Sequence, residues 1–112
     1  MKYLMMVCVD DTKTAYEPGQ DDSVEPWVEE MDGKGIRLAG DRTRPQSDWT
    51  TVKIRGGELL VSDGPYAETK EYVAGFDLLE CADLDEAIEV ASKHPMAKAG
   101  VLELRPIWPF QD

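Results

Sequence analysis

Two residues of this 112-residue sequence have side chains suited to acid–base chemistry at neutral pH. His94 is the single histidine, and imidazole has the side-chain pKa that ordinarily lies nearest neutrality. Asp63 precedes Gly64 and Pro65, so its carboxylate either accepts backbone N–H groups in a tight turn or acts as a general base or ligand anchor. His94 follows a predicted helix and either complements the helix dipole or reaches a pocket beside Asp63.

A second chemical candidate lies near the end of the sequence. Arg105 and Glu103 alternate with leucines in the last predicted strand, so both charged side chains share one face of that strand. If this face becomes the wall of a cleft, the Arg105 guanidinium can fork onto a carboxylate ligand. The alternative is an ion pair within the sheet, with Asp77 or Glu80 as the partner.

Other familiar catalytic and binding patterns are absent from the sequence. No group of His, Cys and carboxylate residues has metal-ligand spacing, so we expect no metal ion. The pair Gly56 and Gly57 is too short for a phosphate-binding loop, and we expect no cofactor. Cys8 and Cys81 lie in apolar surroundings, which favours small buried thiols in a reducing, cytoplasmic compartment.

Charge and hydropathy exclude further classes of partner. Twelve basic and 23 acidic residues give a net charge of −11, which disfavours direct binding to nucleic acid or to an anionic membrane surface. The longest apolar run covers residues 3–9, far short of the ~20 residues of a membrane span. No cleavage site follows this run, so we expect no signal peptide.

The elements that must position these residues follow from hydrophobic periodicity and turn signals. The pattern predicts strands at residues 2–9, 36–42, 72–81 and 100–108, and helices at residues 22–35 and 83–93. Two further strands, at residues 50–55 and 58–62, flank Gly56 and Gly57, which is a hairpin signal.

Each predicted helix begins with a capping box, formed by Asp22 with Glu25 and by Asp83 with Glu86. Apolar residues at helical spacing predict the buried side of each helix. They are Val24, Trp27, Val28 and Met31 in the first helix, and Leu84, Ala87, Ile88 and Ala91 in the second.

This order of elements indicates one α+β domain over residues 1–112, with a ferredoxin-like split βαβ sheet and two helices on one face. The first strand is apolar on both faces, although two helices can cover only one face of such a sheet. The same face of a second copy is the simplest cover for the other side, which predicts a homodimer.

The stretch at residues 62–71, SDGPYAETKE, resembles the signature of the YCII-related proteins, in particular the DGPF subgroup. Further segments agree in order and spacing: TTVK at residues 50–53, Gly75 with Phe76, and VLELRPI at residues 101–107. Tyr66 stands where the subgroup has Phe, which adds a hydroxyl group.

The resemblance implies a dimeric α+β barrel, a fold shared with muconolactone isomerase, but no settled reaction. It suggests a catalytic His–Asp pair in which Asp63 matches the aspartate, whereas the histidine belongs near the first helix and this chain has only His94. Glu68, Lys70 and Glu71 form a run of alternating charge, which is usually a solvated face. Because the run belongs to the signature, the alternative is that Glu68 or Lys70 makes a fixed ion pair across the dimer or at the mouth of the cleft.

Taken together, these observations predict a homodimeric YCII/DGPF-type domain that binds a small molecule in a cleft beside the turn at Asp63. Tyr66, Glu68, Lys70 and Arg105 are the other candidate ligand-binding residues. One alternative is a cofactor-free isomerase or lyase that uses Asp63 with His94 as acid and base. Another is a regulatory interaction module, because some DGPF genes neighbour those of extracytoplasmic-function sigma factors.

Overall fold

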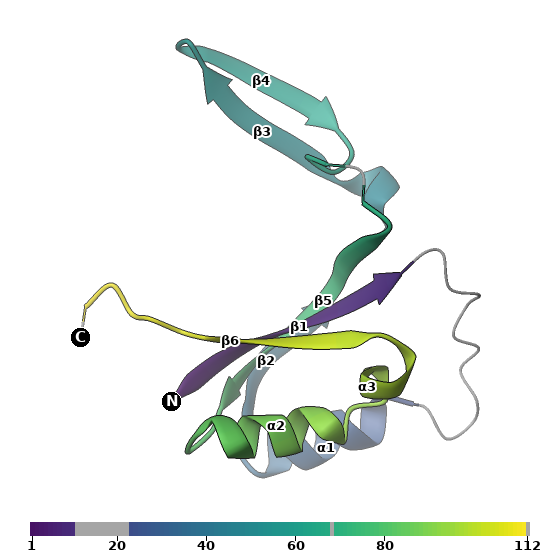
Figure 1. Ribbon diagram of the computed structural model, residues 1–112, viewed down its shortest axis with the longest axis vertical. Helices are drawn as coiled ribbons and strands as arrows, with labels where there is room; N and C mark the ends of the chain where they lie inside the picture. The colour runs from purple at the N-terminus through teal and green to yellow at the C-terminus, as the bar shows by residue number, and fades with distance from the viewer. Residues whose placement is uncertain (11–22, 68, 112) are drawn as a thin grey trace.

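The computed structural model describes residues 1–10, 23–67 and 69–111 (Figure 1). The segment at residues 11–22, which includes half of the first predicted capping box, and Glu68 lie outside the described residues. The elements are β1 (Lys2–Asp10), α1 (Glu25–Gly33), β2 (Arg37–Arg42), the 3-10 turn η1 (Gln46–Asp48), β3 (Thr50–Arg55), β4 (Glu58–Asp63), β5 (Glu71–Glu80), α2 (Leu84–Ser92), α3 (Met96–Ala99) and β6 (Val101–Pro106).

Four strands form an antiparallel sheet in the order β2-β5-β1-β6. With α1 between β1 and β2, and α2 between β5 and β6, this is the ferredoxin-like α+β arrangement predicted from the order of elements. The β3–β4 hairpin is a separate two-stranded sheet inserted between β2 and β5. The 3-10 turn η1 and the short helix α3 were not predicted.

Helices α1 and α2 cover one face of the four-stranded sheet, and the buried core lies between the two layers (Figure 1). Tyr3 lies opposite Leu79 in the sheet, and both side chains are almost fully buried beneath the helices. From α1, Trp27 and Met31 enter this core as predicted and Val28 packs against it, whereas Val24 is 40% exposed, contrary to the prediction.

The prediction for the second helix was partly wrong. Ala87 and Ala91 are buried, but Leu84 and Ile88 are 50% and 51% exposed, and Val90 takes their place in the core. The Trp27 indole Nε1 donates a buried hydrogen bond of 2.9 Å to the Val90 carbonyl oxygen, which links α1 to this side of α2.

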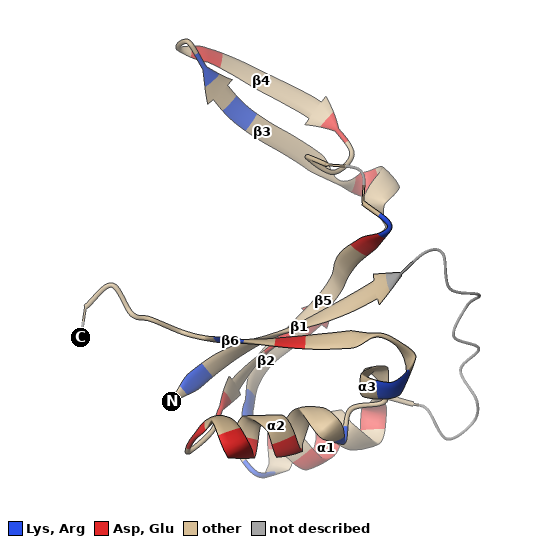
Figure 2. Cartoon of the chain, viewed as in Figure 1, with Lys and Arg blue, Asp and Glu red and all other residues tan. Residues whose placement is uncertain are grey.

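The predicted capping box of α2 is confirmed. The Asp83 carboxylate accepts a hydrogen bond of 2.9 Å from the Glu86 amide, and the Glu86 carboxylate accepts one of 3.0 Å from the Ala82 amide. These bonds satisfy backbone donors that have no partner within the first turn of a helix. Acidic residues are also spread along the length of α1 and of α2 (Figure 2).

Among the described residues, one ion pair is largely buried, at the edge of the sheet formed by β2. Arg37 Nε donates to Asp77 Oδ1 at 2.8 Å, and Arg37 Nη2 donates to the Gly40 carbonyl oxygen at 2.8 Å. Burial raises the pKa of the Asp77 carboxyl, although the Arg37 guanidinium opposes this shift. A Cβ atom on Gly40 would lie 2.1 Å from Asp77 Oδ1, so glycine is needed for this close approach.

The opposite face of the sheet has no helix over it among the described elements (Figure 1). At its centre Leu4 lies opposite Leu78, and Met6 lies opposite Phe76. We call these four residues the open sheet face. Both faces of β1 carry apolar side chains, as predicted. Only those on the helix side are deeply buried in a single chain.

The β3–β4 hairpin extends away from the four-stranded sheet (Figure 1). Gly56 and Gly57 have φ angles of +58° and +79°, which suits the tight turn predicted from this glycine pair. The Cα radius of gyration is 16.3 Å, whereas a compact domain of this length has roughly 13 Å. In the described residues, no helix is long and apolar enough to cross a membrane.

Candidate functional site

A cleft of about 740 Å³ lies where the base of the hairpin meets the beginning of β5. Three separate segments line it: residues 43–51, the turn at residues 64–67, and residues 69–73. Its aromatic side chains are Trp49, Tyr66 and Tyr72. The volume lies within the usual range of small-molecule sites.

Trp49 is held in position from both sides. Its indole Nε1 donates a hydrogen bond of 2.7 Å to the Arg44 carbonyl oxygen, which closes the segment around η1. Its ring packs edge-on against Tyr72, with ring centroids 5.9 Å apart and planes at 76°. The cleft therefore has an ordered aromatic corner where the hairpin joins the sheet.

The turn after β4 forms the adjacent wall, and Thr51 and Gly64 hold it. The Gly64 amide donates to the Trp49 carbonyl oxygen at 2.7 Å, and the Thr51 hydroxyl donates to the Gly64 carbonyl oxygen at 2.9 Å. Gly64 has a φ of +91°, a backbone conformation that glycine adopts without the strain of a side chain.

Asp63 does not hold this turn through its side chain. The Asp63 residue is exposed, it ends β4 opposite Thr50, and within the described residues its carboxylate accepts no hydrogen bond. The interpretation of Asp63 as the acceptor of an Asx-turn was therefore wrong. The turn is instead held by the hydroxyl of Thr51, the second residue of β3, which donates to the Gly64 carbonyl oxygen.

Polar groups are few within the cleft, and most are hydroxyls. The described lining includes one guanidinium, one carboxylate and one amide, together with four threonine hydroxyls. They belong to Arg44, Glu71, Gln46, Thr43, Thr50, Thr51 and Thr69. The Arg44 side chain is 84% exposed and pairs with Asp48 at 3.0 Å. This combination of aromatic walls and uncharged hydroxyls can bind an apolar ring and fix its orientation by hydrogen bonds.

Of the residues singled out from the signature, Tyr66 lines the cleft and is 90% exposed. Lys70 is exposed and does not line the cleft, whereas the candidate Glu68 lies outside the described residues. Trp49 and Tyr72 were missed, since neither belongs to a catalytic pattern. The only sequence signal for them was their nearness to the family motifs.

Arg105 does not line the cleft either. Its Nε donates to the Glu103 carboxylate on the same strand, so the predicted pairing with Asp77 or Glu80 was wrong. Asp77 faces the helix side of the sheet and pairs with Arg37 instead.

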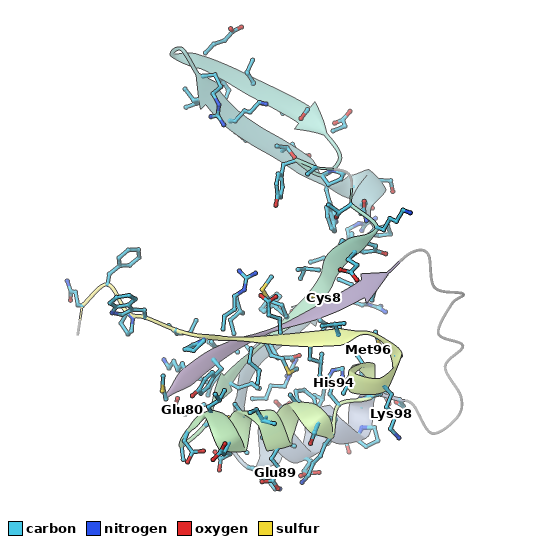
Figure 3. All side chains as sticks on the ribbon, viewed as in Figure 1. Cys8, Glu80, Glu89, His94, Met96 and Lys98 are labelled. Atoms are coloured by element: carbon cyan, nitrogen blue, oxygen red, sulfur yellow. The ribbon has the colours of Figure 1, made fainter. Side chains whose placement is uncertain are left out.

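His94 lies in the core, on the helix side of the sheet beside Met96 (Figure 3). His94 is only 5% exposed, and its imidazole Nδ1 accepts a hydrogen bond of 3.0 Å from the Met96 amide. Burial lowers the pKa of His94 to about 4. A helix dipole or a nearby carboxylate would raise the pKa of an imidazole, whereas here desolvation of the imidazolium dominates.

The structure does not bring Asp63 and His94 together. Asp63 ends a strand of the projecting hairpin, while His94 is buried beneath the four-stranded sheet. The cleft contains neither side chain. A shared acid–base site therefore has no geometric support within one copy of the chain.

A smaller hollow of about 200 Å³ lies at the end of β1 and includes Cys8, Glu71 and Glu103. Burial and the nearby Glu103 carboxylate raise the pKa of the Cys8 thiol, which disfavours the nucleophilic thiolate. In the described part of the chain, no group of three His, Cys, Asp or Glu residues is placed to hold a metal ion.

These features define a ferredoxin-like α+β protein with an aromatic cleft at the base of an inserted hairpin. The YCII-related domain family matches residues 1–111 of the sequence, so the chain belongs to the YCII-related family. An uncharacterised protein of Rhizobium meliloti (strain 1021) is 43% identical to it over 68 residues, which cover 59% of this chain. The match spans about half of that relative, 55% of its length.

Proposed function

We propose that this YCII-related protein is a homodimer that binds a small, ring-bearing molecule in the cleft beside the Gly64 turn. The observation that carries the proposal is the cleft itself, which is about 740 Å³ in volume and is lined by Trp49, Tyr66 and Tyr72. Aromatic side chains bury apolar rings by offset or edge-on contacts, and they lose little conformational entropy in doing so.

The charges around the cleft restrict the class of ligand. Among the described residues, one guanidinium, on Arg44, one carboxylate, on Glu71, and one amide, on Gln46, line a surface that is otherwise aromatic, aliphatic or hydroxylic. A ligand with several charges would leave most of them without partners, at a high desolvation cost. An amphipathic molecule with one ring system and one or two polar groups fits this lining best.

The open sheet face supports the dimer. Leu4, Met6, Phe76 and Leu78 form an apolar centre without a covering helix, and Phe76 is 39% exposed in one copy. The other three residues are partly buried, and Arg105 and Glu103 lie beside Leu4 and Met6 on the same face. An apolar patch with a polar rim of this kind marks an interaction site. The two free cysteines, Cys8 and Cys81, support a reducing, cytoplasmic setting.

The binding proposal can be tested with 8-anilinonaphthalene-1-sulfonate, a fluorescent amphipathic aromatic anion. We expect the probe to bind and to shift the indole N–H resonance of Trp49, while the buried Trp27 resonance stays in place. Replacing Tyr66 by Ala is expected to weaken binding several-fold, because Tyr66 lines the cleft. The matched control is Trp108→Ala, an exposed aromatic residue outside the cleft. Equal weakening by both variants, or an unchanged Trp49 resonance, would overturn the proposed site.

A further inference from the structure

The outer part of one face of the β3–β4 hairpin is apolar and exposed, while the pair Thr50 and Asp63 lies on the same face at the base of the hairpin. Val52 lies directly opposite Val61, and Ile54 lies directly opposite Leu59. All four side chains share one side of the two-stranded sheet because paired residues face the same way. Each of the four is 60–63% exposed. We call these four residues the apolar hairpin face.

A hairpin of two strands is marginally stable when nothing packs against it. This one stands clear of the four-stranded sheet (Figure 1). The register places the charged pair Arg55 and Glu58 on its other side. A partner surface packed against the hairpin would explain both its position and its exposed apolar residues.

The area needed for a stable dimer favours a second copy of the chain as that partner. The four side chains of the apolar hairpin face expose on the order of 250 Å² of apolar surface. A stable interface buries about 800 Å² on each partner, so this face is too small to hold a complex by itself. The open sheet face of the same chain is a second unpartnered apolar surface, and two-fold symmetry would use both surfaces twice.

We propose that, in the homodimer, each copy lays its apolar hairpin face on the open sheet face of the other copy. This exchange covers Ile54 and Leu59 of one copy with Met6 and Phe76 of the second. It rests on the proposed dimer and adds the contact that forms it. It explains why the hairpin extends away from its own sheet instead of folding back over it.

The exchange also connects dimerisation with ligand binding. Thr50 and Thr51, at the base of the hairpin, and Gly64, in the turn that follows it, line the cleft. When the partner holds the outer part of the hairpin, its base becomes fixed relative to Tyr72 on β5. Dimerisation is then expected to set the width of the cleft.

The first test replaces Ile54 and Leu59 together by Ser. The matched control replaces Arg55 and Glu58, the neighbouring pair on the other side of the hairpin, by Ser. Sedimentation equilibrium should show a wild-type dimer of the 12.5 kDa chain. We expect the apolar double variant to have a dissociation constant raised by roughly 100-fold or more, and the control to change it less than tenfold. A wild-type monomer would overturn both the dimer and the exchange, whereas a dimeric apolar variant would overturn the exchange alone.

A second measurement uses the wild-type protein, so it does not depend on whether a variant folds. Amide hydrogen exchange of residues 50–63 is followed while the protein is diluted through its dimer dissociation constant. We expect protection of these amides to fall in step with the dimer fraction, because the uncovered hairpin opens readily. Equal exchange rates in dimer and monomer would overturn the proposal.

A third measurement locates the contact on the partner. Cys8 lies on the same side of the sheet as Met6, since it pairs with Val101 as Met6 pairs with Glu103, while Cys81 is only 2% exposed. In the Leu59→Cys variant, a flexible bis-maleimide is expected to link residue 59 of one copy to Cys8 of the other and to double the chain mass under denaturing conditions. The Cys8→Ala, Leu59→Cys protein should remain unlinked. Linking in both proteins would show a contact between the two hairpins, and linking in neither would show no contact; either result overturns the exchange.

Discussion

The His94 ring packs edge-on against the Trp27 ring, with the ring centroids 4.7 Å apart and the planes at 66°. Trp27 comes from α1, and its indole also donates to the Val90 carbonyl oxygen of α2, so one aromatic residue ties both helices and His94 together. His94 is thereby removed from water and kept neutral. His94 therefore behaves as a packed core residue, and protonation of its ring destabilises the folded state.

We expect His94 to make the protein less stable in acid. Its pKa is about 4 in the folded protein and about 6.5 when unfolded, so the unfolded chain binds the extra proton first. The stabilising effect of a neutral His94 is complete above pH 6.5 and is lost as the pH falls through 4, with a total change of about 3 kcal/mol in the free energy of unfolding.

Urea unfolding at a series of pH values between 7 and 4 measures this loss. The control is His94→Asn, whose side-chain oxygen can still accept from the Met96 amide but which does not titrate. The carboxylates titrate in both proteins, so the difference between the two curves isolates the histidine. A difference that stays constant over this range would contradict the buried, neutral imidazole.

Removing the Asp63 carboxylate is expected to leave the pKa of His94 at about 4. The two residues lie in separate parts of the structure, and only a charge within ~4–6 Å shifts a pKa strongly. An NMR titration of the single histidine in the wild type and in Asp63→Asn tests this expectation. A change in the pKa of His94 on substitution would restore the acid–base pair as an interpretation.

Replacing Arg37 by Met is expected to lower the free energy of unfolding by about 3 kcal/mol, because it leaves the Asp77 carboxylate buried without its cation. The two side chains are only 17% and 10% exposed. The matched control is Arg44→Met, which breaks the exposed pair with Asp48 and should change stability by less than about 1 kcal/mol. Chemical denaturation measures both variants, and equal effects would show that burial does not decide the strength of these pairs.

Thr51→Val is expected to cost about 1 kcal/mol of stability, because the Gly64 carbonyl oxygen loses the hydroxyl that donates to it. Asp63→Ala should change stability by less than about 0.5 kcal/mol, since this exposed carboxylate accepts no hydrogen bond in the described structure. Thermal unfolding of the two variants compares them directly. A larger loss of stability in Asp63→Ala than in Thr51→Val would show that the Asp63 carboxylate holds the turn.

Local patterns in the sequence determined most of the elements. The Gly56 and Gly57 pair predicts the hairpin because only a tight turn with positive φ angles joins two adjacent strands there. The capping box of Asp83 and Glu86 predicts the start of α2, because its hydrogen bonds join residues only three or four positions apart. The order of these elements then restricts the sheet to a ferredoxin-like topology.

The tertiary structure decided the features that depend on residues distant in the sequence. The buried side of α2 contacts Trp27 of α1 through the hydrogen bond to Val90, and the pKa of His94 depends on its removal from water by the packed core. The cleft combines Trp49, from the segment before β3, with Tyr66 and Tyr72, which follow β4. Tyr66 alone of these three was singled out by its place in a motif. Sequence patterns record local hydrogen bonding and periodicity, whereas a cavity or a desolvated ring exists only once separate segments have packed together.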